Sequence, residues 1–196
     1  HSYLNDSEFL TITGYEAYIR KDGQCNYDVY APEVHINLFA RDPDNTAIVC
    51  YNPNYCKYIP PEQQPAYKKV GSQKPRYLSA EYVNEFVKTA KENGYIATYN
   101  HPYWSMEAES AIMQYEGFFS MEICNWSSMN AAGRREYNID LYHKLLRAGK
   151  RVFVHSADDN HNKNPFDHQK NDSFGGFAMV MADKLEYDTV FHAIET

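Results

Sequence analysis

The chain has 196 residues, 43% of them hydrophobic and 23% charged, which is the composition of a globular protein of one domain. Its net charge of −7 and the lack of a Lys/Arg run longer than a pair argue against a nucleic-acid partner. No apolar stretch of about 18 residues is present, so no membrane partner is expected either.

The predicted elements begin with strand-like segments and continue as an alternation of helices and strands. A segment rich in Asn, Pro, Tyr and Gln separates the two parts and predicts a loop-rich insertion over about 41–76. The helix over 79–94 has Ser79 as its N-cap and Gly94 as its C-terminal stop. We expect strands at 9–19, 33–40, 95–99, 117–124, 150–154 and 175–182, and helices at 79–94, 107–115, 134–149 and 186–195.

The repeating order of strand and helix predicts an α/β fold with a parallel sheet, either doubly wound or closed as a barrel. The sequence contains neither a G-x-G-x-x-G fingerprint nor a P-loop. A nucleotide-binding fold therefore has no support, and a barrel or partial barrel is the favoured prediction.

Carboxylates and imidazoles stand close to the ends of several predicted strands. Glu16, His35, His101 and Glu122 belong to four of them, and "HSADDNHN" (155–162) follows a fifth. In βα architectures the carboxyl ends of the strands meet on one face, where active sites form. Crowded groups of this kind need a cation to compensate them, so we favour a metal site over a purely structural polar cluster.

The composition of this set indicates which ion it would hold. Histidine, aspartate and glutamate without cysteine suit Zn, Mn or Fe rather than Ca or a structural zinc. Asp159 and His161 stand two residues apart, so in an extended loop both side chains can point to the same side. We expect Asp158 and His155 to contact the metal ligands without binding the metal themselves. We expect Asn100 and Arg134 to contact substrate.

Several segments together resemble the PHP family of metal-dependent phosphoesterases, named after polymerase and histidinol phosphatase domains. The resemblance spans nearly the whole chain outside 41–76 and is carried by "GYEAY", "HINLF", "GYIATYNHPYW", "MEICN", "DLYHKLLRAGKRVFVHSADDNHN" and "GGFAMVMA". It implies a distorted β/α barrel of about seven strands and two or three Mn, Fe or Zn ions. It also implies hydrolysis of phosphate esters.

The resemblance assigns metal ligands by position. Glu16 matches the family's glutamate that bridges two metals, and His35 and His101 match two ligands that share one metal with it. Asp159 and His161 match the terminal Asp-x-His that serves the other metals, and His1 matches a remnant of an upstream ligand motif. The family's H-x-H pair is missing before Glu16. The expectation is therefore one domain over 1–196, a distorted (β/α)7 TIM-like barrel that is incomplete at its N-terminus.

Three functions are compatible with these residues. The first is hydrolysis of a small phosphorylated molecule by a metal-activated water. The second is ester or amide hydrolysis at the same site, because an activated water also attacks carbonyl carbon. The third is a degenerate, non-catalytic module of the same family, favoured by the missing N-terminal ligands.

The cysteines indicate the compartment. Cys25, Cys50, Cys56 and Cys124 form no C-x-x-C pair and no regular framework, which is typical of free thiols in the cytoplasm. Because the sequence begins at His1 rather than Met, an upstream targeting segment and secretion stay open as alternatives.

Overall fold

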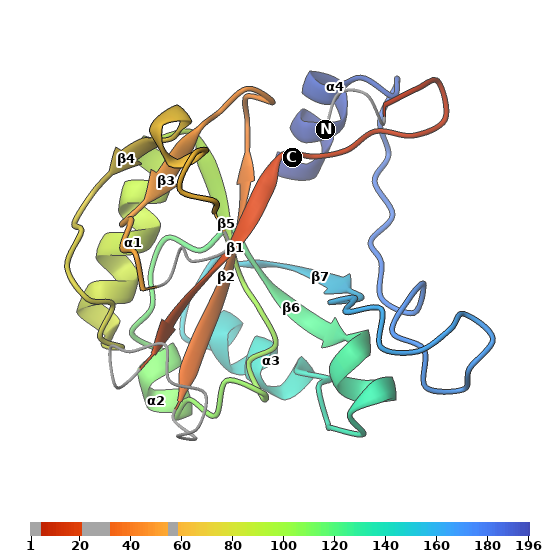
Figure 1. Ribbon diagram of the computed structural model, residues 1–196. Coiled ribbons are helices and arrows are strands. Elements are labelled where there is room, and N and C mark those ends of the chain that lie inside the picture. The colour runs from red at the N-terminus through yellow and green to blue at the C-terminus, as the bar shows by residue number, and fades with distance from the viewer. Residues whose placement is uncertain (1–4, 21–31, 55–58) are drawn as a thin grey trace.

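A five-stranded mixed sheet organises the chain (Figure 1). The computed structural model describes residues 5–20, 32–54 and 59–196. In spatial order the sheet consists of β1 (Gly14–Arg20), β2 (Glu33–Ala40), β5 (Tyr95–Tyr99), β6 (Ser120–Asn125) and β7 (Phe153–Ala157). β2 pairs antiparallel with β1 and β5, whereas β5, β6 and β7 are parallel.

The predicted (β/α)7 barrel is wrong. Within the described ranges β1 and β7 each pair on one side only, so the sheet has two edges and does not close. The physical reason lies in the first two strands. A parallel connection needs a crossover of a dozen or more residues, usually a helix, and no amphipathic helical pattern separates the first two strands in the sequence. They pair directly as antiparallel neighbours, with Gly14 opposite Phe39 and Arg20 opposite Glu33.

The two faces of the sheet differ in polarity. In β2 the side chains of Val34, Ile36, Leu38 and Ala40 are fully buried and alternate with His35, Asn37 and Phe39, which are half-buried. The apolar face is covered by α1 (Ala80–Glu92), which contributes Val83, Phe86, Val87 and Ala90 to the core. The opposite face therefore carries the polar side chains of the strands, among them His35.

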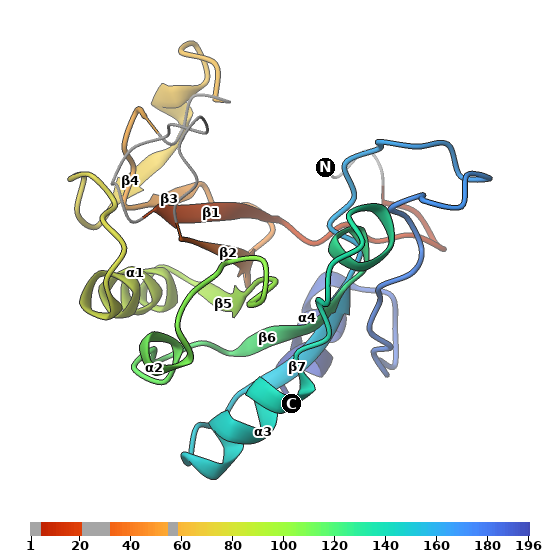
Figure 2. The ribbon, with the colours of Figure 1, turned by 90° about the horizontal axis from the view of Figure 1, so that it is seen from below.

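Three helices lie along the same side of the sheet: α1, α2 (Glu109–Ile112) and α3 (Ile139–Arg147) (Figure 2). α4 (Tyr187–Glu195) lies apart from them, near the N-terminal segment (Figure 1). The Tyr187 hydroxyl donates to the carbonyl of Ala40, and Arg41 forms an ion pair with Glu195. No helix of the described ranges has both the length and the apolarity needed to cross a membrane.

The insertion contains a small sheet of its own. β3 (Ala47–Val49) pairs in parallel with β4 (Lys68–Val70), and a 3-10 helix, η2 (Gln64–Ala66), precedes β4. Arg76 attaches this unit to the main sheet. Its buried guanidinium donates to the carbonyls of Val49 and Cys50 in the insertion and of Tyr18 in β1.

Other predicted elements also differ from the structure. β7 lies at Phe153–Ala157 instead of 150–154, so His155 is inside the strand and not after it, and the helix expected over 107–115 is confined to Glu109–Ile112. The segment 175–182 forms no strand, and its Phe177, Met179 and Met181 side chains are exposed. The helix expected over 134–149 starts only at Ile139, after a π-helical turn, η3 (Ser127–Ala131). The reason for the late start is that Tyr137 forms a bridge with Cys124, so the chain before α3 runs beside β6 instead of coiling.

Candidate metal centre

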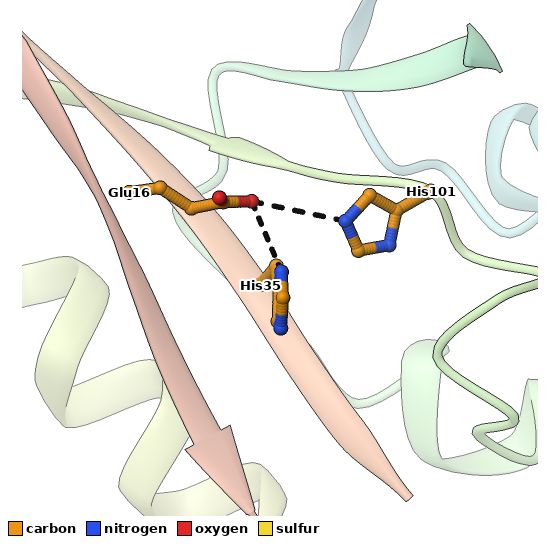
Figure 3. Close-up of side chains that lie close together, drawn as sticks. All are labelled: Glu16, His35 and His101. Atoms are coloured by element: carbon orange, nitrogen blue, oxygen red, sulfur yellow. Dashed lines mark hydrogen bonds and ion pairs between the residues drawn. The ribbon is translucent and has the colours of Figure 1, made fainter. Parts of the chain in front are cut away.

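Three side chains on the polar face of the sheet converge on one point (Figure 3). One ligand atom each from Glu16, His35 and His101 lies within 4.8 Å of the other two. The Glu16 Oε1 atom is 3.0 Å from His35 Nδ1 and 3.7 Å from His101 Nε2. One carboxylate oxygen and two imidazole nitrogens are the donor set of catalytic zinc and related ions.

The spacing of these atoms fits a bound ion. Two ligands held at roughly 2.1 Å from a tetrahedral ion lie about 3.4 Å apart, and the two measured separations bracket that distance. Three protein ligands leave a fourth position for water or substrate, as catalytic sites require. The residues present therefore fit a single divalent cation.

The sheet topology explains why these side chains meet. Glu16 lies in the first half of β1, and Tyr18, two residues further and on the same face, is paired with His35 in β2. Because β2 is antiparallel to β5, the start of β2 lies beside the end of β5. The backbone N–H of Asn100 donates to the carbonyl of His35, which brings His101 next to that histidine. The expectation that carboxyl ends of parallel strands meet was therefore wrong for Glu16 and His35.

A second carboxylate supports His35 from behind. His35 Nε2 lies 2.8 Å from Glu33 Oε1, and the other oxygen of Glu33 pairs with buried Arg20 at 2.6 Å. Burial by itself would lower the pKa of His35, but the hydrogen bonds and charges of Glu16 and Glu33 outweigh it and raise the pKa to about 9. A carboxylate behind a histidine fixes its tautomer and increases its basicity as a ligand.

Glu16 stays ionised. Burial would raise its pKa, yet the hydrogen bonds and charges of His101 and His35 outweigh burial and hold the pKa well below its ordinary value. Asn100 Nδ2 also donates to Glu16 Oε1 at 2.8 Å, and Asn100 is buried. Asn100, expected to contact substrate, thus orients the Glu16 carboxylate.

A second pair of carboxylates lies beside this centre. The amide of Asn125 donates to Glu122 at 3.0 Å and to Asp159 at 3.2 Å, so it joins the two acids. Burial raises the pKa of Glu122 to about 7. Burial, followed by the negative charge of Glu16, also raises the pKa of Asp159. Among the described residues, the cluster with ligand spacing contains Glu16, His35 and His101 but not Asp159.

The remaining expected site residues lie outside the cluster. The side chain of His161 is 51% exposed, and its Nδ1 contacts the carbonyl of Asp159. Asp158 accepts the backbone N–H groups of residues 174–176 at 2.5 to 2.9 Å and so anchors a loop. His155 contacts Ser120 Oγ at 3.1 Å, and burial lowers its pKa to about 4, which keeps it neutral. His1 lies outside the described residues.

Trp104 borders the centre and was not expected from the sequence. Its ring centroid lies 4.9 Å from those of both His35 and His101. The guanidinium of Arg134, which is half-buried, lies 5.9 Å from the Trp104 ring centroid. Arg134 and the two imidazoles are thus neighbours of the same aromatic ring.

The role of Glu33 could have been inferred from the sequence. Glu33 and His35 are two positions apart on a strand, so they share a face, and a carboxylate at that spacing indicates a partner for the histidine. Trp104 follows His101 in a turn, where periodicity gives no information about side-chain direction.

A comparison of the chain with protein-family models, curated proteins and solved structures found no match.

Proposed function

We propose that the protein is a metal-dependent hydrolase of phosphate esters. The observation that carries the proposal is the convergence of Glu16, His35 and His101 at ligand spacing, with Glu33 behind His35. The resemblance of the sequence motifs to PHP phosphoesterases supports the choice of phosphate ester as substrate.

Each residue of the centre has a proposed role. Glu16, His35 and His101 would hold one divalent ion, Zn, Mn or Fe. Such an ion, when bound, activates a water molecule and withdraws charge from the phosphoryl oxygens. Asn100 keeps the Glu16 carboxylate in place, and Glu33 keeps the imidazole of His35 oriented.

Arg134 is the proposed contact for the substrate phosphate. Its guanidinium has no carboxylate partner among the described residues, and it lies 5.9 Å from the centroid of the Trp104 ring, which borders the centre. A guanidinium binds phosphate oxygens in a forked, charge-assisted geometry.

A purified full-length chain tests the proposal directly. We expect about one ion per chain by elemental analysis, together with turnover of an aryl phosphate that a chelator abolishes and added metal restores. His101→Ala should lower both metal content and turnover. His143→Ala is the matched control, because His143 is exposed on α3, and it should change neither.

The outcomes separate the alternatives. Chelator-sensitive turnover of an aryl ester, without turnover of the phosphate, would replace the proposal by esterase activity at the same centre. Bound metal without turnover of either substrate would identify a non-catalytic module. Unchanged metal content in His101→Ala would show that the metal does not bind at the proposed centre.

A further inference from the structure

The turn that carries His101 has an unfavourable backbone conformation. His101 has φ +28°, in a region that non-glycine residues rarely adopt and that is often found at functional sites. Its N–H donates to Glu122 Oε2 at 2.8 Å, and its carbonyl accepts from the backbone N–H of Ser105 at 3.1 Å. The turn is thus closed by a hydrogen bond of its own and held to β6 by Glu122.

Glu136 holds the other half of the same turn. One of its carboxylate oxygens accepts the backbone N–H of Tyr103 at 2.9 Å, and the other accepts that of Trp104 at 2.8 Å. Glu136 is fully buried, and Asn138 Nδ2 provides a third hydrogen bond at 2.9 Å. A buried carboxylate is tolerated only when hydrogen bonds compensate it, so its presence here needs a reason.

The segment around Glu136 is fixed in turn by β6. The carbonyl of Glu136 accepts from the N–H of Asn125, and the N–H of Asn138 donates to the carbonyl of Ile123 at 2.7 Å. The carboxylate therefore forms a rigid link between the end of β6 and residues 103–104.

We propose that Glu136 is a positioning residue of the metal centre. Its hydrogen bonds to the backbone N–H groups of Tyr103 and Trp104 hold this part of the turn so that the indole ring lies against the imidazoles of His35 and His101. The ring limits rotation of both imidazoles and excludes water from that side of the centre. Glu136 itself touches no ligand atom. This inference rests on the proposed centre and extends it to a residue outside the ligand set.

The test uses Co²⁺ binding, which reads the geometry of the centre without any turnover. The chain has two tryptophans and 18 tyrosines, so in a Trp126→Phe background the emission excited at wavelengths that tyrosine does not absorb comes from Trp104 alone. Because Trp104 lies beside both imidazoles, bound Co²⁺ should quench it. Visible absorption of the bound Co²⁺ reports the coordination geometry.

Glu136→Gln is the informative variant. The glutamine amide has one acceptor oxygen, so its NH2 group would face the second backbone N–H and that hydrogen bond would be lost. We expect Co²⁺ affinity to fall by about tenfold or more, as for loss of groups that orient metal ligands, with weaker quenching and a changed absorption spectrum at saturation.

Two controls separate positioning from stability. Glu92→Gln makes the same substitution at an exposed position of α1 and should change nothing. Leu145→Ala removes a buried side chain of α3 and lowers stability, but it should leave the spectrum of bound Co²⁺ unchanged.

A double-mutant cycle completes the test. If Glu136 acts through Trp104, then Glu136→Gln combined with Trp104→Ala should weaken Co²⁺ binding no more than Trp104→Ala does. Wild-type affinity and spectrum in Glu136→Gln, or simple addition of the two effects, would overturn the inference while leaving the metal centre intact. Failure of the wild-type chain to bind Co²⁺ would overturn both the centre and the inference.

Discussion

Glu33 accepts a hydrogen bond from His35 at 2.8 Å while its other oxygen pairs with Arg20 at 2.6 Å. A candidate metal ligand, a carboxylate and a buried guanidinium are therefore connected in series across the polar face. The arrangement ties the orientation of His35 to an ion pair that solvent does not reach, because the side chains of Arg20 and Glu33 are each only 3% exposed.

Glu33→Gln should weaken metal binding by about tenfold or more, because the neutral amide orients His35 less firmly and makes it a less basic ligand. The dissociation constant for Zn²⁺, measured by competition with a chromophoric chelator, checks the prediction. Glu92→Gln is the control, since Glu92 is exposed and paired only with Lys88 at 3.9 Å. Equal Zn²⁺ affinity in both variants would contradict a role for Glu33.

The metal-free protein should lose stability as the pH rises from about 6.5 to about 9. The folded-state pKa of His35 is raised to about 9 from an ordinary 6.5, so its protonated form stabilises the fold fully below 6.5, and the gain disappears as the pH passes through 9. Urea unfolding at several pH values measures this. A His35→Asn variant should lack the decline between pH 6.5 and 9.

The stability of the protein at acid pH should depend on Glu16. Its pKa is held below the ordinary value, so its ionised form contributes stability above pH 4.5 that is lost as the pH falls. Because the Glu16 side chain is 39% exposed, solvent screening reduces the size of this effect. The pH dependence of Glu16→Gln, compared with wild type below pH 4.5, isolates it; identical acid limbs would show that the carboxylate is not stabilised in the folded state.

Metal binding should stabilise the fold in proportion to the logarithm of the free ion concentration. At 100 times the dissociation constant the gain is about 2.7 kcal/mol, if the unfolded chain does not bind. Thermal unfolding with added Zn²⁺ checks the prediction. His101→Ala should lose most of this dependence, whereas His143→Ala should keep it. A similar rise in midpoint for both variants would indicate that Zn²⁺ binds elsewhere.

Arg76→Ala should destabilise the protein by at least about 3 kcal/mol, because three buried carbonyls would lose a charged donor. Chemical unfolding measures the loss. Lys74→Ala provides the control at an exposed position two residues earlier. A change below 1 kcal/mol in Arg76→Ala would mean that water replaces the guanidinium at little cost.

Asp158→Asn should loosen residues 174–176 without affecting the metal centre. The carboxylate accepts three backbone N–H groups, and an amide has one oxygen to offer them. Hydrogen exchange of Gly175 and Gly176 should accelerate, while Zn²⁺ affinity stays at the wild-type value. A loss of Zn²⁺ affinity would instead support the expectation that Asp158 acts behind the ligands.

The sequence indicated most of the secondary structure and part of the candidate site. Alternation in "EVHINLFA" predicted β2, and the Ser79 and Gly94 signals bounded α1 closely. Three of the residues that suggested a metal, Glu16, His35 and His101, lie at ligand spacing, whereas Asp159 and His161 are not part of that cluster. The strand and the helix depend on neighbours along the chain, which local patterns record, whereas the meeting of the three side chains depends on how β1, β2 and β5 pair.

The arrangement of the strands was decided only in three dimensions. The order of elements suggested a closed barrel, but β2 pairs antiparallel with both of its neighbours. The order of elements along the chain does not determine the direction in which two strands pair. The segment 175–182 has the pattern of a strand, yet among the described residues no strand pairs with it. The supporting roles of Glu33, Trp104 and Glu136 arise from contacts between β2, the turn after β5 and the chain before α3, because backbone N–H groups from one segment find their acceptors in another.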